Sequence, residues 1–344
     1  MTQKAIHDAA QLTRMGLGLF TEKQVLVAGG AGFVGAQLCK RLLTAGVRVI
    51  CVDNLQTGYL ANIAELIDRP GFQFVRHDIT RPLEIDEPIH EIYNLACPAS
   101  PPKYQLNPIH TLKTSVFGAL NLLGLARKKS ARILQASTSE IYGDPDASPQ
   151  TELYHGNVNP VGPRSCYDEG KRAAETLFHD YGLQHGVTTK IARIFNTYGP
   201  GMASDDGRVV SNFIIEALRG KAITIYGDGR QTRSFCYVDD LLDGLMLLMA
   251  TPHDVSYPVN LGNDTEFTIA ELAQIVQAKI GPSCGMIFSA IPVDDPRQRK
   301  PDIRLARQVL GWSPQVALDS GLDRTIPWFQ RQLAAECHKE VASA

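Results

Sequence analysis

Short apolar runs alternate with segments of helical periodicity along the first two thirds of the chain. Residues 25–28 form a continuous apolar run, which is typical of a strand buried on both faces, and residues 36–43 repeat apolar positions at helical spacing. Gly46 is expected to end that helix, and a second apolar run occupies 47–52. A strand, a glycine turn, a helix and a strand in this order predict a parallel βαβ unit.

The alternation continues, and it predicts an α/β fold with a doubly wound parallel Rossmann sheet. Further strands are predicted at 72–75, 91–96, 132–137 and 190–195, with helices at 111–129 and 168–185. Beyond residue 195 the loops become rich in glycine and proline, and the segments become short. We therefore expect a leader over 1–22, a Rossmann domain over 23–195 to which the chain returns around 236–262, and a smaller C-terminal substrate-binding domain over 196–344.

Composition narrows the class of protein. The chain has 344 residues, of which 44% are hydrophobic and 20% charged, and its 34 basic and 36 acidic residues give a net charge of -2. This balance is typical of a globular protein and argues against nucleic acid as the main partner. The 7 cysteines are scattered with no CxxC pair, so we expect reduced thiols and no metal site. No segment approaches the roughly 20 apolar residues of a membrane span, so we expect a cytoplasmic protein with no membrane partner.

A glycine-rich turn joins the first predicted strand to the first predicted helix. Residues 29–35 read Gly-Gly-Ala-Gly-Phe-Val-Gly, and such glycines let the backbone approach a pyrophosphate at the helix N-terminus. Asp53 ends the second strand, where a carboxylate hydrogen-bonds ribose hydroxyls and repels a 2′-phosphate. The sequence therefore predicts NAD, rather than NADP, as the cofactor. Expected around the adenosine are Asn54, Thr57 and Gly58, with Asp78 and Ile79 beside the adenine ring.

Two polar segments carry candidate chemistry. Tyr167 and Lys171 are four residues apart in a predicted helix, so their side chains share one face, and an ammonium beside a phenol lowers the pKa of the phenol. Such a phenolate can take a proton from a hydroxyl group. Thr138, Ser139 and Glu140 follow a buried strand, and open α/β sheets bind ligands at the carboxyl ends of their strands. The structural alternatives are a surface helix for the first segment and a cap for the second.

Longer strings resemble those of the extended short-chain dehydrogenase/reductase family, within its nucleotide-sugar branch the UDP-glucuronate decarboxylases. The matching strings are 52–54 with 57–58, 98–102, 137–145, 166–172, 192–200, 206–213, 294–296 and 299–303. The resemblance runs from Lys23 to about Phe329 and so covers nearly all of the chain. Two positions depart from the pattern, because Cys97 stands where serine is expected beside the nicotinamide and Lys103 where a neutral residue is expected.

The resemblance implies conversion of UDP-glucuronate to UDP-xylose through a 4-keto intermediate, with NAD recycled in each turnover. The catalytic set that it implies is Tyr167, Lys171, Thr138, Glu140, Ser139 and Arg299. The implied cofactor contacts are Gly29, Gly32, Phe33, Val34, Gly35, Asp53, Asn54, Thr57, Gly58, Asp78, Ile79, Leu95, Cys97, Thr114, Ala136, Tyr167, Lys171, Thr197 and Arg208. The implied contacts to the UDP-sugar are Lys113, Asn121, Tyr181, Gln184, Asn196, Arg233 and Arg299.

The resemblance also implies a homodimer that pairs the helices over 111–129 and 168–185. Candidate interface positions are Leu120, Leu123, Leu177 and Phe178, whose alternative role is to pack on their own sheet. Because either role suits an apolar helix face, the sequence leaves both open.

Four alternative functions remain open. They are a decarboxylase that releases the 4-keto pentose and NADH, a 4-epimerase, a 4,6-dehydratase, and a non-catalytic NAD-binding protein. In the resemblance, epimerases lack an acid equivalent to Glu140 and dehydratases carry aspartate at the position of Ser139, so both are disfavoured. The presence of both Tyr167 and Lys171 disfavours a non-catalytic protein.

Overall fold

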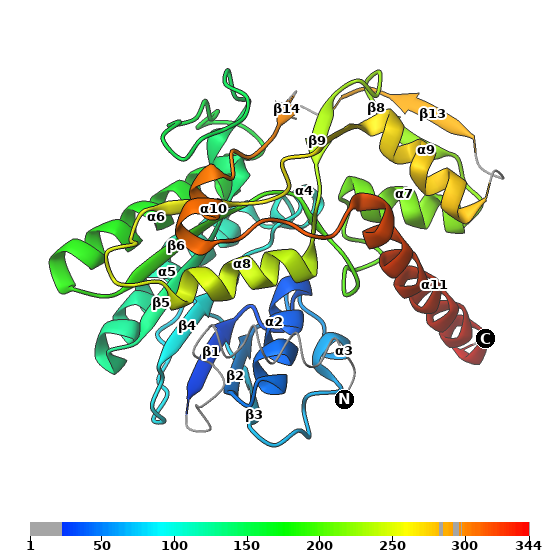
Figure 1. Cartoon of the computed structure of the whole chain (residues 1–344). Helices are drawn as coiled ribbons and strands as arrows, with labels where there is room; N and C mark the ends of the chain where they lie inside the picture. The colour runs from blue at the N-terminus through cyan, green and yellow to red at the C-terminus, as the bar shows by residue number, and fades with distance from the viewer. Residues whose placement is uncertain (1–22, 282–284, 292–295, 297, 344) are drawn as a thin grey trace.

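A seven-stranded parallel sheet forms the centre of the computed structural model, which describes residues 23–281, 285–291, 296 and 298–343 (Figure 1). The strand order is β11-β6-β5-β4-β1-β2-β3, and each neighbouring pair is parallel. The strands are β1 (Gln24–Ala28), β2 (Arg48–Asp53), β3 (Phe72–Arg76), β4 (Glu91–Asn94), β5 (Arg132–Thr138), β6 (Thr189–Ile194) and β11 (Pro258–Leu261). The six strands predicted from apolar runs all lie in this sheet, which confirms the doubly wound Rossmann fold. The predicted leader lies outside the described residues.

Alternate side chains of the strands enter two separate cores, one on each face of the sheet. In β1, Val25 and Val27 belong to the core that contains residues of α2 (Phe33–Thr44) and α8 (Val238–Ala250). Leu26 and Ala28 belong to the other core, beneath α5 (Pro108–Lys129) and α6 (Ser165–His185). Since both faces of β1 are covered, its apolar run is continuous rather than alternating.

Helix α5 begins three residues earlier than its apolar periodicity predicted. The side chain of Asn107 accepts a hydrogen bond from the backbone N–H of His110, and Pro108 occupies the first turn. An asparagine cap followed by proline is a strong helix start, because the cap satisfies an exposed N–H and proline lacks one. The prediction missed this start because neither residue is part of the apolar pattern.

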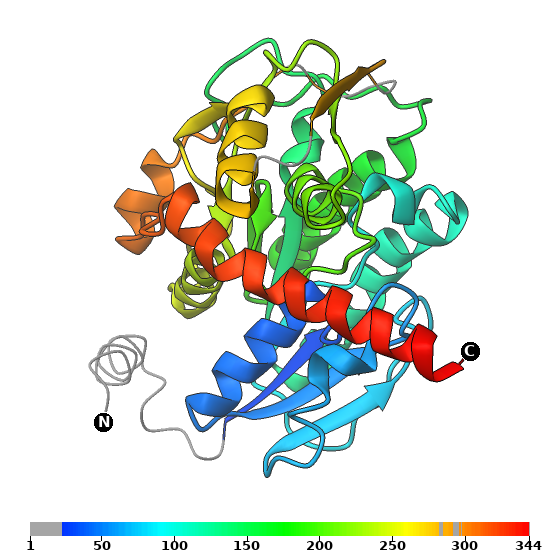
Figure 2. The same ribbon diagram turned by 90° about the vertical axis from the view of Figure 1, so that its right-hand side faces the viewer.

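The remaining elements lie beyond the carboxyl edge of the sheet or on its flanks. They are α3 (Leu60–Ile63), α4 (Pro101–Tyr104), η1 (Ser139–Tyr142), β7 (Thr197–Tyr198), α7 (Val209–Leu218), β8 (Ile223–Tyr226), β9 (Thr232–Ser234), β10 (Cys236–Tyr237), β12 (Glu266–Thr268), α9 (Ile269–Ile280), β13 (Met286–Ser289), β14 (Gln298–Arg299), α10 (Arg304–Leu310) and α11 (Leu318–Ser343). Strand β9 pairs with β12 and β14, and β8 pairs with β13. Figure 2 shows α11 running diagonally along one side of the molecule.

Among the described helices, none combines the length and the apolar character needed to cross a bilayer. The proposed division of the chain at residue 195 stays a prediction.

Candidate active site

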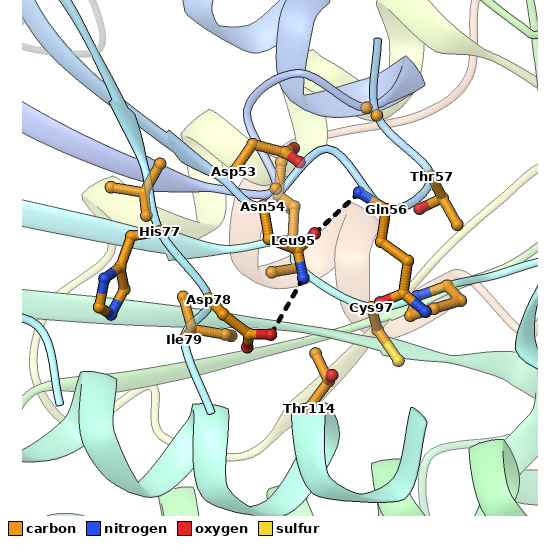
Figure 3. Close-up of a pocket in the computed structure, with 16 residues that line it drawn as sticks. Asp53, Asn54, Gln56, Thr57, His77, Asp78, Ile79, Leu95, Cys97 and Thr114 are labelled. Atoms are coloured by element: carbon orange, nitrogen blue, oxygen red, sulfur yellow. Dashed lines mark hydrogen bonds between the residues drawn. The ribbon is translucent and has the colours of Figure 1, made fainter. Parts of the chain in front are cut away.

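The first cavity lies over the glycine turn, at the carboxyl ends of β1, β2 and β4 (Figure 3). The predicted cofactor contacts that line it are Gly29, Gly32, Asp53, Asn54, Thr57, Gly58, Asp78, Ile79, Leu95, Cys97 and Thr114. Asp53 is held in place by the backbone, since one carboxylate oxygen accepts from the N–H of Ala31 at 3.0 Å and the other from the N–H of Leu55 at 2.8 Å. Burial raises the pKa of Asp53, although these backbone bonds oppose the shift.

Close packing of the backbone around the turn requires glycine at two of its positions. A Cβ at Gly29, where φ is +77°, would lie 2.7 Å from the backbone of Leu95 and Ala96. A Cβ at Gly35 would lie 2.1 Å from the carbonyl oxygen of Gly29, so Gly35 packs behind the turn and does not line the cavity. Helix α2 starts at Phe33; the capping residue before it is Gly32, which has no side chain to cap the helix, and its first turn contains no acid. Its first N–H groups are therefore available, and these features fit the pyrophosphate of a dinucleotide.

A second cavity of about 520 Å³ continues from the first at Leu95 and Cys97, which line both. Its walls come from the carboxyl ends of β5 and β6 and from the later elements α7, β8, β9 and β14. The predicted site residues that line it are Val34, Leu95, Cys97, Ala136, Thr138, Ser139, Glu140, Tyr167, Lys171, Asn196, Thr197, Arg208, Arg233 and Arg299. The structure thus brings both candidate catalytic segments to one place, as expected from strand ends in an open sheet.

Tyr167 is fixed by aromatic stacking and lies near Lys171. Its ring stacks on that of Tyr104, with centroids 5.1 Å apart and planes 5° from parallel. The ammonium of Lys171 lies 5.7 Å from the centre of the Tyr167 ring and donates to the carbonyl of Ala136 at 2.8 Å. Both side chains are buried.

The prediction that Lys171 lowers the pKa of Tyr167 below its ordinary value was wrong. Burial raises the pKa of Tyr167 well above its ordinary value, Cys97 adds to the rise, and a hydrogen bond with Thr138 opposes it. Burial likewise lowers the pKa of Lys171, whose ammonium is bonded to a carbonyl. Loss of hydration therefore outweighs the neighbouring positive charge.

Glu140 is held by two arginines from distant parts of the chain. Arg299 donates from both terminal nitrogens, to Oε1 at 2.7 Å and to Oε2 at 2.8 Å, and Arg164 donates to Oε2 at 3.2 Å. Burial alone would raise the pKa of Glu140, but the guanidinium groups of Arg299 and Arg164 outweigh it and lower that pKa. Glu140 is therefore a carboxylate, and both of its oxygens accept hydrogen bonds from guanidinium groups.

Asp168 lies beside this cluster on α6 and was not assigned a role from the sequence. It is buried, and its Oδ1 has no hydrogen-bond partner among the described residues. Burial raises the pKa of Asp168 to about 8, and the negative charge of Glu140 adds to the shift. The cluster thus contains one carboxylate tied to arginines and one carboxyl group that favours its neutral form.

Several basic side chains face the second cavity. Arg233 donates to the carbonyls of Thr232 at 2.8 Å and Pro296 at 2.5 Å. Arg208 pairs with Asp206, and its guanidinium lies 6.0 Å from the ring centre of Phe33, which itself lines neither cavity. These guanidinium groups give the cavity a positive character suited to anionic groups of a ligand.

Four of the predicted substrate contacts do not reach either cavity. They are Lys113, Asn121, Tyr181 and Gln184. Lys113 and Gln184 are exposed, Asn121 donates to the carbonyl of Ile79 at 2.8 Å, and Tyr181 packs edge-on against His185. All four lie on α5 or α6, and Tyr181 packs against the core beneath these helices.

Other lining residues carry no signal in the local sequence. They include Gln105, Arg164, Tyr226, Gln231 and Phe235. Arg164 precedes α6 in a glycine- and proline-rich loop, where an arginine is most often a solvated surface charge. Tertiary folding alone brings it to Glu140.

Comparison with known proteins agrees with this geometry. Residues 25–262 match the NAD dependent epimerase/dehydratase family. UDP-glucuronic acid decarboxylase 5 of Arabidopsis thaliana is 56% identical over 300 residues, covering 87% of this chain and 87% of that protein. UDP-glucuronic acid decarboxylase 1 of Xenopus tropicalis is 50% identical over 318 residues, covering 92% of this chain and 75% of that protein. Among solved structures, UDP-glucuronic acid 4-epimerase from Bacillus cereus in complex with UDP-glucuronic acid and NAD has a TM-score of 0.79 at 26% identity, covering 90% of this chain and 99% of that chain.

Proposed function

The chain belongs to the NAD dependent epimerase/dehydratase family, and from that membership we propose that it decarboxylates UDP-glucuronate to UDP-xylose with NAD as a recycled cofactor. The observation that carries this proposal is the arrangement of side chains in the wall of the second cavity beside Tyr167. There the neutral Ser139 stands next to Glu140, which is paired with Arg299. The identity of 50–56% to UDP-glucuronic acid decarboxylases supports the same choice within the family.

The first step is removal of a proton from the C4 hydroxyl of the sugar. Tyr167, as the phenolate, takes this proton, and Thr138 donates a hydrogen bond to the same oxygen. Bound over the glycine turn, NAD supplies a reversible hydride acceptor for C4. The positive charge of Lys171, 5.7 Å from the centre of the Tyr167 ring, opposes the rise that burial causes in the pKa of Tyr167 and so favours the phenolate. The stacked ring of Tyr104 fixes the direction of the phenol and so keeps it aligned with the sugar.

Loss of carbon dioxide follows from the chemistry of the oxidised sugar. A C4 ketone makes the C5 carboxylate a β-keto acid, whose carbon–carbon bond breaks as its electrons move into the ketone. The resulting enolate would take up a proton at C5. Return of the hydride to C4, with the proton on Tyr167 going back to the C4 oxygen, would then give UDP-xylose and restore NAD. A second carboxylate next to the substrate carboxylate would raise the electrostatic cost in a buried site, and Ser139 avoids it. Arg299 neutralises Glu140 and presents its guanidinium to the cavity, where it orients the sugar. Arg233, Asn196 and Arg208 are proposed to hold the diphosphate and neighbouring groups.

Incubation of the protein with NAD and UDP-glucuronate tests the proposal. We expect release of carbon dioxide and formation of UDP-xylose without net growth of the near-ultraviolet absorbance of NADH. Growth of that absorbance in step with carbon dioxide would instead identify an enzyme that releases the 4-keto pentose. Absence of carbon dioxide, with UDP-galacturonate as product, would identify an epimerase and refute the proposal.

We also propose a homodimer that pairs α5 and α6 of two copies. The exposed apolar side chains on these helices are Ile109, Leu112, Phe117, Leu120 and Leu183. Of the interface positions named from the sequence, Leu120 is 40% exposed, whereas Leu123 and Phe178 are fully buried in their own core. A row of exposed apolar residues on adjacent helices is typical of an interaction surface. Light scattering that gives the mass of one chain at micromolar concentration would refute the dimer.

A further inference from the structure

The two partners of the Glu140–Arg299 pair lie 159 residues apart, so their alignment depends on how their segments are anchored. Glu140 belongs to η1, which directly follows β5 of the central sheet, whereas Arg299 belongs to β14, which pairs with β9 outside that sheet. One buried amide contacts both segments. It is the side chain of Asn260, which lies in β11 at the end of the central sheet and is 0% exposed.

The side chain of Asn260 uses its acceptor on one segment and its donors on the other. Its Oδ1 accepts from the hydroxyl of Tyr142 at 2.8 Å, and Tyr142 ends the same short helix that carries Glu140. Its Nδ2 donates to the carbonyl of Asp302 at 3.2 Å and to that of Gln150 at 3.0 Å. Asp302 follows Arg299 by three residues. Both N–H groups and the oxygen of the amide are therefore occupied, which makes the orientation of this side chain unique.

Gln150, which is bonded to Asn260, forms further hydrogen bonds with the segment that follows Arg299. The N–H of Gln150 donates to the carbonyl of Lys300 at 2.8 Å, and the side-chain oxygen of Gln150 accepts from the N–H of Lys300 at 2.8 Å. The carbonyl of Gln150 also accepts from the N–H of Asp302 at 2.9 Å. The backbone directly after Arg299 is thus bonded to a residue that is 0% exposed and is itself bonded to Asn260.

The other anchor, Tyr142, is equally constrained. Arg193 donates to the hydroxyl of Tyr142 at 3.0 Å and forms an ion pair with Glu175. Glu175 in turn accepts from the hydroxyl of Ser137, one residue before Thr138. The catalytic segment at the end of β5 and the segment that carries Arg299 therefore meet through Asn260, in a network that is buried and hydrogen-bonded throughout.

We propose that Asn260 is a positioning residue, which sets the place of Arg299 against Glu140 and thereby the direction of the Arg299 guanidinium in the cavity. This inference rests on the proposed function, since it assigns Arg299 a role with the sugar. Asn260 lines neither cavity, so it acts through the segments it holds and not by contact with a ligand. A displacement of a catalytic group by about 1 Å can cost on the order of 10²-fold in rate.

The test is a double-mutant cycle between Asn260 and Arg299. Asn260→Ala and Arg299→Ala should each lower the turnover number about tenfold or more, and the double variant should lose little beyond Arg299→Ala, because Asn260 acts through Arg299. Asn260→Asp keeps the acceptor for Tyr142 but turns an oxygen toward two carbonyls, so it should behave like Asn260→Ala. Affinity for NAD, measured by calorimetry, should change less than about threefold in the single variants. Losses that multiply in the double variant would overturn the proposal.

Two controls keep the result interpretable. Val276→Ala opens a space in the buried core beneath α9, away from this network, and should lower thermal stability without changing the turnover number. Tyr142→Phe removes the hydrogen bond to Asn260 and the one from Arg193 but keeps both Asn260 bonds to the segment after Arg299, so it should give a smaller loss of turnover even if Asn260→Ala does not fold. The double-mutant cycle between Asn260 and Arg299 is repeated with the free energy of unfolding in urea as the measured quantity, because that measurement needs no substrate. If the wild-type protein does not act on UDP-glucuronate, coupling between Asn260 and Arg299 in unfolding still supports the positioning role, and additive unfolding energies still refute it.

Discussion

The pair between Arg299 and Glu140 makes a strong prediction about stability. The two side chains are 7% and 15% exposed and share two hydrogen bonds, of 2.7 and 2.8 Å. Loss of one partner from a buried ion pair typically costs about 3–5 kcal/mol, because the other charge stays buried. Arg164 remains 3.2 Å from Glu140 in Arg299→Ala and compensates part of the charge. We therefore expect the free energy of unfolding to fall by about 3 kcal/mol, at the lower end of that range.

The matched control is a second arginine in the same stretch of chain. Arg307 pairs with Asp264 at 2.8 Å, and the two side chains are 51% and 36% exposed. Exposed pairs contribute about 0–1 kcal/mol, so Arg307→Ala should change the unfolding free energy little and leave UDP-xylose formation intact. Urea denaturation measures the first quantity, and carbon dioxide release measures the second. Equal effects of the two variants on unfolding, or native turnover in Arg299→Ala, would refute the reasoning.

Arg299→Ala should also change how the free energy of unfolding depends on pH. The folded protein holds the pKa of Glu140 below its ordinary value, so the stability contributed by the pair is present above that ordinary value and is lost as pH falls through the folded-state pKa. In Arg299→Ala burial is less opposed, so Glu140 takes up a proton more readily. The difference in unfolding free energy between wild type and Arg299→Ala should therefore shrink as pH falls through the acidic range. A difference that stays constant from neutral to acidic pH would contradict the assignment of Glu140 as a carboxylate.

Four further predictions concern the cofactor turn and the catalytic helix. Tyr167→Phe should fold and bind NAD but lose roughly 10²–10⁴-fold in turnover, because it lacks the acid–base group; near-native turnover would remove Tyr167 from the mechanism. Gly35→Ala should abolish NAD binding in calorimetry, since its Cβ would lie 2.1 Å from the carbonyl oxygen of Gly29, and unaltered affinity would show that the turn is not the phosphate site. With Asp53 at the end of β2, the wild-type protein should bind NAD more tightly than NADP, and equal affinities would be inconsistent with a ribose contact there. Asp168 keeps its proton in the folded state up to a pKa of about 8 while the unfolded chain has released it, so wild-type stability should fall as pH rises from the ordinary range of an aspartate toward that pKa. Asp168→Asn should flatten this dependence in urea denaturation, and an unchanged slope would assign it to another group.

Asp168 and Tyr104 illustrate what a local pattern cannot reveal. Asp168 follows Tyr167 directly, yet its raised pKa arises from burial and from Glu140, which lies on another element. Tyr104 stacks on Tyr167 from a four-residue helix that has no pattern of its own. In both cases the chemistry depends on solvent exclusion and on a neighbour brought close by folding, and neither is encoded within a window of sequence.

The sequence by itself determined the parallel sheet, the glycine turn and the placement of Thr138, Tyr167 and Lys171 at one edge. These features depend on short-range rules, since apolar runs specify buried strands, glycines specify the turn, and parallel strands bring their carboxyl ends together. Tertiary structure alone decided that Arg299 and Arg164 hold Glu140, and that burial raises the pKa of Tyr167 although Lys171 lies beside it. It also placed Lys113 and Tyr181 away from both cavities. Charge pairing and desolvation are set by distances between segments far apart in the chain, and only the packed structure fixes those distances.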